Sequence, residues 1–148
     1  MKHKILLLNS LFLAVAIPLL LVFYLLPFDF FVDVKQVVYR DVCLGDTTQL
    51  VTADREVKWN DGYTGSVSGE VFRYNTDGTK VETVIKRGKD FAYQVSAEPV
   101  TYEVVWDTPF TKVGEYGASD LVRLNAPIFD KIRFFSEDTQ KFNVIICG

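Results

Sequence analysis

Apolar and polar positions follow two different patterns along this 148-residue chain, and the pattern changes near residue 30. Residues 5–28 carry no charge, and as a helix they would be about 36 Å long, more than the roughly 30 Å hydrocarbon core of a bilayer. From residue 33 onward, apolar residues alternate with polar ones, which is typical of half-buried β-strands. The pattern therefore predicts a transmembrane helix over residues 5–28 and a β domain over residues 33–148.

The alternation in the β domain is clearest in residues 91–97 and 101–106. In the second segment Tyr102, Val104 and Trp106 share one face of the predicted strand. Residues 72–83 read as a hairpin, because an Asp-Gly pair at its centre readily forms a tight turn. Further short runs rich in β-branched and aromatic residues occupy residues 34–42, 47–53, 67–74, 79–86, 121–124, 131–135 and 141–147. We expect an all-β, antiparallel domain of about seven to nine strands.

The N-terminal segment has two interpretations, a cleaved signal peptide or an uncleaved anchor. The apolar part of a signal peptide is about 7 to 15 residues long and ends in small residues. This run is longer and ends in bulky residues around Tyr24, so we expect an uncleaved signal anchor. Lys2 and Lys4 place residues 1–4 in the cytoplasm by the positive-inside rule, and residues 33–148 are then exported. A secreted domain, released by cleavage, is the alternative.

Aromatic residues gather at the end of the apolar run. Tyr24, Phe28, Phe30 and Phe31 would lie at the outer membrane interface, where aromatic rings favour the level of the lipid headgroups. The other interpretation places some of them in the core beside the first strand. The sequence leaves both interpretations open.

The charge and the rarity of histidine exclude several classes of function. The chain has 16 Lys and Arg against 19 Asp and Glu and no basic stripe, so we expect no nucleic-acid partner. His3 is the only histidine and lies on the cytoplasmic side of the predicted anchor, which leaves the exported part without a base for a Ser-His-Asp or Cys-His site. Two cysteines without an exported histidine do not make a zinc site. We therefore expect no enzyme activity, metal or cofactor.

Some polar residues in the predicted loops suggest other functions, but only weakly. Asp61, Asp77, Asn60 and Asn75 are oxygen ligands in type, but they occur at turns and lack the spacing of a calcium loop. The 18 acids from residue 33 onward single out no catalytic pair, so a small exported hydrolase using carboxylates is only an alternative. The basic turn over residues 86–89 reads as a solvated hairpin tip rather than a contact with anionic headgroups.

The order of short strands, with Trp59 and Trp106 on candidate core strands and residues 108–124 reading TPFTKVGEYGASDLVRL, resembles immunoglobulin-like and fibronectin type III-like β-sandwich domains. In these folds a tyrosine closes a corner by bonding to upstream backbone, and the resemblance gives this role to Tyr116. The cysteines depart from the antibody pattern, since Cys43 ends the first strand and Cys147 ends the last.

The resemblance also implies a disulfide. In such sandwiches part of the first strand runs parallel beside the last strand, so Cys43 and Cys147 would meet, and Gly45-Asp46 would turn the chain into the second strand. Their bond would close a loop of roughly 100 residues, for which the chain-entropy model gives about 4.7 kcal/mol. An exported location allows such a bond to persist.

The expected function is that of a membrane-anchored, non-catalytic interaction or accessory module of the cell envelope, with a protein or glycan partner. A pilin-like subunit shares the layout of an apolar helix followed by a small β domain. However, the N-terminal segment lacks the glycine at the processing site and the glutamate that pilins carry in the mature helix.

Overall fold

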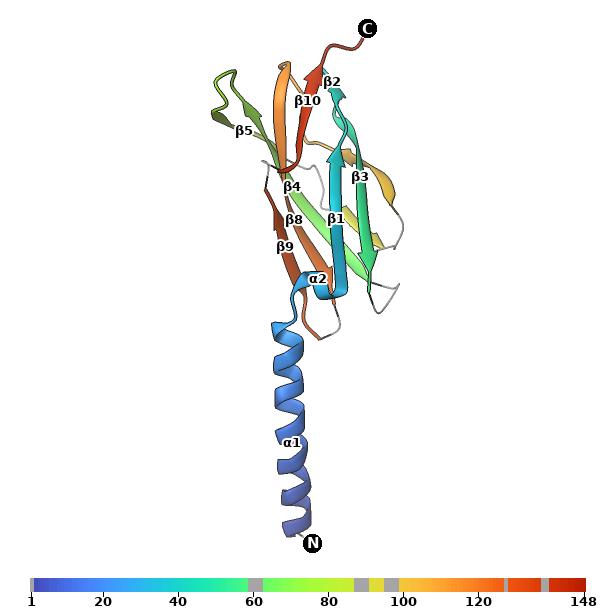
Figure 1. Ribbon diagram of the computed structural model, residues 1–148, viewed down its shortest axis with the longest axis vertical. Helices are drawn as coiled ribbons and strands as arrows, with labels where there is room; N and C mark the ends of the chain where they lie inside the picture. Colours follow the sequence, from blue (N-terminus) through green and yellow to red (C-terminus); the bar gives the residue numbers. More distant parts are fainter. Residues whose placement is uncertain (1, 59–62, 87–90, 95–98, 127, 137–138) are drawn as a thin grey trace.

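A computed structural model describes residues 2–58, 63–86, 91–94, 99–126, 128–136 and 139–148 of the chain. One long helix stands at one end of a mostly β domain, and the C-terminus lies at the opposite end (Figure 1). The elements in chain order are α1 Lys2–Leu25, α2 Phe28–Phe31, β1 Val32–Tyr39, β2 Val42–Cys43, β3 Thr48–Val57, β4 Thr64–Tyr74, β5 Lys80–Lys86, β6 Phe91–Gln94, β7 Val100–Val105, β8 Gly114–Asn125, β9 Lys131–Phe135 and β10 Lys141–Ile145.

Helix α1 ends before the predicted boundary at residue 28. Pro27 disfavours helical geometry at the residue before it and has no N–H to donate, so the helix stops at Leu25 and the four-residue α2 begins after the proline. Over residues 4–25, α1 is long and apolar enough to cross a membrane, and its most apolar stretch is not buried against the rest of the protein.

The strands form two sheets. The smaller sheet has the order β1-β3-β7, and the larger has the order β2-β10-β8-β4-β5, with β6 also on β4 and β9 also on β8. All of these pairings are antiparallel except the one between β2 and β10. The described part has ten strands, more than the seven to nine predicted, because the run over residues 34–42 is divided into β1 and β2. Strands β9 and β10 pair with successive parts of β8, and β5 and β6 with successive parts of β4.

The first predicted strand, residues 34–42, is divided between the two sheets. Strand β1 pairs with β3. The strand is interrupted at Arg40 and Asp41, and β2 then pairs in parallel with β10 in the other sheet. Cys43 lies opposite Ile145 in this register and at disulfide distance from Cys147, with the two Cα atoms 5.5 Å apart. After β2, Gly45 has a φ of 94°, a backbone geometry that favours glycine, and the chain turns into β3 there.

The larger core cluster contains side chains from both sheets. Val51 and Val104 come from the smaller sheet, and Tyr116 and Phe142 from the larger. At its centre Phe110 is fully buried, and its ring makes edge contacts with Trp106, Tyr116 and Phe142. A second cluster lies next to α2 and consists of Phe28, Phe31, Val32, Tyr63, Val67, Val122 and Leu124.

Several predicted strands agree closely with the structure. Strand β9 has the predicted bounds of residues 131–135, and β4 and β5 form the predicted hairpin, in which Gly78 has a φ of 81°. On β7, Val104 is buried and Val105 is exposed, as the alternation predicts. By contrast, β8 is much longer than residues 121–124. Trp59, Asn60, Asp61 and residues 87–89 and 95–97 lie outside the described residues.

Replacing both cysteines by alanine is expected to lower the free energy of unfolding by about 2–5 kcal/mol, because the unfolded chain loses a long covalent loop. Urea unfolding of the full chain in detergent measures the change. Wild-type protein under reducing conditions should match the double variant. Intact mass should rise by two hydrogen atoms on reduction. Reactive free thiols in the unreduced, folded protein would contradict the bridge.

Candidate functional site

The residues singled out from the sequence lie at opposite ends of the molecule. Strand β2, which ends at Cys43, and the C-terminus lie at the end of the domain away from α1, and α1 with the expected membrane flanks lies at the other (Figure 1). Tyr116 of β8 lies opposite Phe142 of β10 in register. The Tyr116 hydroxyl donates a hydrogen bond to the backbone carbonyl of Lys112, four residues upstream, at 2.8 Å. These residues therefore form no common site.

The aromatic residues after α1 separate into two groups. Phe28 and Phe31 are buried in the second core cluster, so the core interpretation applies to them. Tyr24 is exposed, and its ring packs edge-on against Phe129 at 5.5 Å between centroids, while Phe30 is half-buried. Lys4 is exposed near the start of α1; the side chain of Lys2 lies outside the described part.

The junction between α1 and the domain depends on Lys131, the first residue of β9. Its buried ammonium group donates hydrogen bonds to the carbonyls of Phe23 at 2.8 Å and Tyr24 at 3.0 Å. These carbonyls belong to the last turn of α1, where the helix itself offers no donor, and a cation also interacts favourably with the negative end of the helix dipole. Asp29 forms an ion pair with Arg133 at the same junction. The sequence offered no local signal for these contacts.

A buried polar group separates the two core clusters. Asp120 points inward from β8, between Ala118 of one cluster and Val122 of the other, and accepts a hydrogen bond from the Tyr39 hydroxyl. With the Gln140 amide nitrogen turned toward the carboxylate, it donates to Asp120 at 2.9 Å and to the carbonyl of Ala118 at 2.9 Å. This arrangement links β1 to β8 and to the start of β10, and its members satisfy one another as buried polar groups must.

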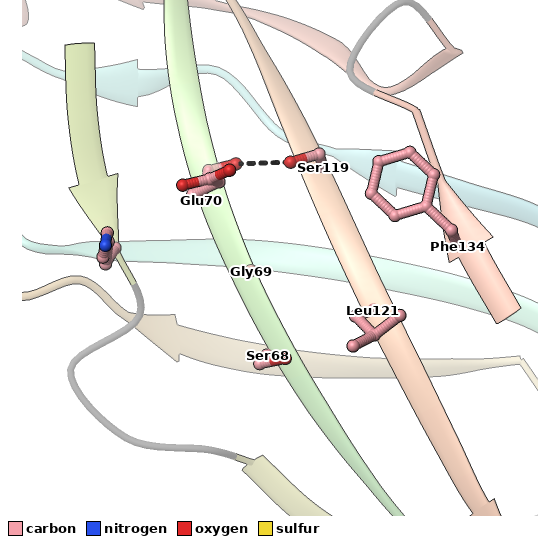
Figure 2. A pocket seen from close by; sticks show the side chains of 7 residues that line it. Ser68, Gly69, Glu70, Ser119, Leu121 and Phe134 are labelled. Atoms are coloured by element: carbon pink, nitrogen blue, oxygen red, sulfur yellow. Dashed lines mark hydrogen bonds between the residues drawn. The ribbon is translucent and has the colours of Figure 1, made fainter. Parts of the chain in front are cut away.

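The outer face of the larger sheet carries a shallow hollow of about 250 Å³ (Figure 2). Leu121 of β8 and Phe134 of β9 lie opposite each other in register on one side of it, and Glu70 and Lys86 line the other side. The Ser119 hydroxyl donates a long hydrogen bond of 3.5 Å to the carbonyl of Glu70. Exposed fractions of 62% for Phe134, 54% for Ile132 and 41% for Leu121 make this face apolar.

A second hollow, of about 530 Å³, lies between the β4–β5 hairpin and the loop before β8. Val81, Ile85 and Pro109 supply its apolar surface. Its polar groups come from Arg73, Thr108, Thr111, Lys112 and Tyr116. Burial raises the pKa of Tyr116, while the Arg73 guanidinium and the hydrogen bond to Lys112 act in the opposite direction. Tyr116 is therefore a neutral hydrogen-bond donor at neutral pH.

Of the residues considered for calcium binding, Asp77 and Asn75 are occupied by turn contacts, whereas Asn60 and Asp61 lie outside the described residues. Asp77 accepts hydrogen bonds from the backbone N–H of Thr79 at 2.9 Å and from its hydroxyl at 2.6 Å, and these contacts lower the pKa of Asp77. Asn75 donates to the same hydroxyl at 3.0 Å. Within the described residues, no three His, Cys, Asp or Glu side chains gather in a group that could hold a metal ion.

No protein-family model matches the chain, and neither does any curated protein. Among solved structures, the chain is similar to a family 123 glycoside hydrolase from Clostridium perfringens that was studied for glycolipid glycan hydrolysis, with a TM-score of 0.35 and 10% sequence identity over 74% of this chain. The chain spans 23% of that enzyme's length. A likeness with this TM-score assigns neither fold nor activity to the chain.

Replacing Lys131 by methionine is expected to loosen the junction, since methionine keeps an aliphatic stem but cannot bond to the carbonyls of α1. Loss of hydrogen bonds from a charged donor costs about 1.5–3 kcal/mol, so amide exchange in residues 26–34 should accelerate by roughly 10- to 100-fold. Hydrogen exchange of the full chain in lipid nanodiscs measures this. Lys131→Arg, which keeps donors at this place, is the control. Unchanged exchange in Lys131→Met would show that the contacts do not hold the junction.

Replacing Asp120 by alanine is expected to lower the free energy of unfolding by about 3 kcal/mol, because Tyr39 and Gln140 lose their buried acceptor. Urea unfolding measures the loss, and a double-mutant cycle with Tyr39→Phe should give a coupling of about 1–3 kcal/mol. The matched control is Ser119→Ala on the same strand, whose weak bond to Glu70 should cost less than about 1 kcal/mol. Equal effects of the two alanine substitutions would contradict this account.

Proposed function

We propose that this protein is a single-pass membrane protein whose β domain, an immunoglobulin-like sandwich outside the cytoplasm, binds a protein partner without catalysing a reaction. The observation that carries this proposal is the exposed apolar helix α1, which is joined through Lys131 to a mostly β domain. Lys2 and Lys4 favour a cytoplasmic N-terminus by the positive-inside rule. The cysteine pair suits an oxidising compartment.

The strand order supports an immunoglobulin-like architecture. Strands β1, β3 and β7 form one sheet, and the remaining strands form the other, with core side chains from both between them. The first strand moves from one sheet to the other and runs parallel to the last, as the resemblance implies. Tyr116 bonds back to Lys112 at the start of β8.

The contacts of Lys131 favour an anchor that stays attached. The ammonium group is buried against the carbonyls of Phe23 and Tyr24, which lie within the helix that signal cleavage would remove. A released domain would leave this buried charge without those two acceptors, which costs free energy. The secreted alternative is therefore disfavoured relative to the anchored one.

The outer face of the larger sheet is the surface that we assign to the partner. Leu121, Ile132 and Phe134 are adjacent on β8 and β9 and all exposed, and clustered apolar side chains on a surface mark contacts with other proteins. Ser68 and Glu70 beside them supply polar groups for the rim of an interface (Figure 2). A partner that presents apolar side chains fits this surface better than a glycan, which needs more hydrogen-bonding groups.

A photo-crosslinking amino acid at position 132 is expected to form a peptide adduct in native membranes, and Phe134→Ser in the same chain should reduce the adduct by at least tenfold, as loss of a central aromatic contact does. The control is the same crosslinker at position 105, where Val105 is 55% exposed on the smaller sheet. Mass spectrometry identifies the adduct. A carbohydrate adduct, or equal adducts at positions 132 and 105, would refute the assigned surface.

A further inference from the structure

The larger hollow has the form of a ligand site. Its lining residues come from β4, β5, the loop before β8 and the start of β8. The β4–β5 hairpin projects from the body of the domain at the end away from α1 (Figure 1). Its volume of about 530 Å³ is within the range of roughly 300–1,000 Å³ that is typical of small-molecule sites. Val81, Ile85 and Pro109 give it an apolar surface, and the groups on its rim are hydroxyls and cations.

The two cations of the hollow, Arg73 and Lys112, have no acidic partner in the part of the chain that the structure describes. Among the described side chains, two acids close in sequence to the loop, Asp107 and Glu115, are engaged elsewhere. Asp107 accepts from the backbone N–H of Lys86 at 3.0 Å and from Thr108 at 3.3 Å, and Glu115 pairs with Lys141 at 3.1 Å. The described side chains that line the hollow therefore carry a net positive charge, within a chain whose net charge is −3.

The register of the sheet fixes the position of Arg73. Arg73 of β4 lies opposite Tyr116 of β8 on one side and opposite Val81 of β5 on the other. Side chains directly opposite one another share a face, so the guanidinium group lies with Tyr116 and Val81 on the side that lines the hollow. The Tyr116 hydroxyl donates to the Lys112 carbonyl, and this hydrogen bond connects the loop before β8 to β8 itself.

We propose that this hollow binds a small organic carboxylate, whose charged group is held by Arg73 and Lys112 and whose apolar part packs against Val81, Ile85 and Pro109. A guanidinium group binds a carboxylate through two parallel hydrogen bonds, and Thr111 adds a hydroxyl donor at the rim. Lipid headgroups of the membrane that α1 would span are distant from the end of the domain at which the β4–β5 hairpin projects (Figure 1). The site is separate from the outer face of the larger sheet, so it goes beyond the function proposed above.

The test uses the full chain in lipid nanodiscs and saturation-transfer difference NMR, which detects weak ligands through their own signals. The probes are N-acetylleucine and its neutral amide, which differ at the carboxylate, and isobutyl phosphate tests whether any anion suffices. Titration should give an affinity for N-acetylleucine at least tenfold higher than for the amide, since a charged hydrogen-bonded pair is lost in the amide. Empty nanodiscs provide the background.

Arg73→Gln is expected to weaken N-acetylleucine binding at least tenfold, whereas Arg123→Gln, an equal change of charge at an exposed position of β8, should leave it unchanged. Circular dichroism establishes that both variants fold, and Lys112→Gln tests the site without changing the sheet. Equal binding of acid and amide, no binding of either, or full binding in Arg73→Gln would overturn the proposal. Tighter binding of isobutyl phosphate than of the carboxylate would overturn its ligand class. None of these results depends on a crosslink at position 132.

Discussion

The parallel pairing of β2 with β10 is the contact on which the rest of the β domain depends. It joins the first strand to the larger sheet only a few residues after β1 has paired in the smaller one, so one continuous segment connects both sheets. The turn that follows is fixed on both sides: Leu44 N–H donates to the Ile145 carbonyl, and Gly45 N–H donates to the Phe110 carbonyl, each at 2.8 Å. Phe110 is the centre of the larger core cluster and belongs to the loop before β8. The position of β2 therefore also fixes the position of this loop, which lines the hollow of about 530 Å³. The cysteine pair lies at the end of β2 and just after β10, where a covalent bond holds these two strands in register.

At the opposite end the constraint is electrostatic. A helix satisfies its own backbone except at its ends, and there the last carbonyls need donors from elsewhere. Lys131 provides them from β9, and the ion pair between Asp29 and Arg133 lies beside it, so the helix enters the domain with a defined direction. The burial of Phe28 and Phe31 adds apolar packing at the same place.

The sequence predicted the features that depend on local pattern. The apolar helix, the β4–β5 hairpin and the bounds of β9 follow from periodicity and turn residues. The first half of β8 was missed because residues 116–120 are buried on both faces, so apolar alternation is absent there. The apolar run continues past the end of the helix, because Pro27 ends α1 at Leu25 although the residues around it are apolar. No local pattern marks Lys131 or Asp120. Tyr39, which donates to Asp120, and Phe23, which accepts from Lys131, both lie more than 80 residues away in sequence, and an isolated charged residue is typical of a solvated surface.

The two ends of the molecule differ in how their cations are paired. In an acidic chain most cations find an acid or another acceptor, and the junction shows this rule, since Arg133 pairs with Asp29 and Lys131 with helix carbonyls. The hollow of about 530 Å³ contains Arg73 and Lys112 on apolar walls, and the described part of the chain supplies neither of them with an acid. Two like charges held near each other repel, and an apolar lining screens them less than water does. Such an arrangement is more stable when an anion occupies it. The cations at the junction already have acceptors within the chain and those of the hollow have no acid, and for this reason we assign a ligand to the hollow and none to the junction.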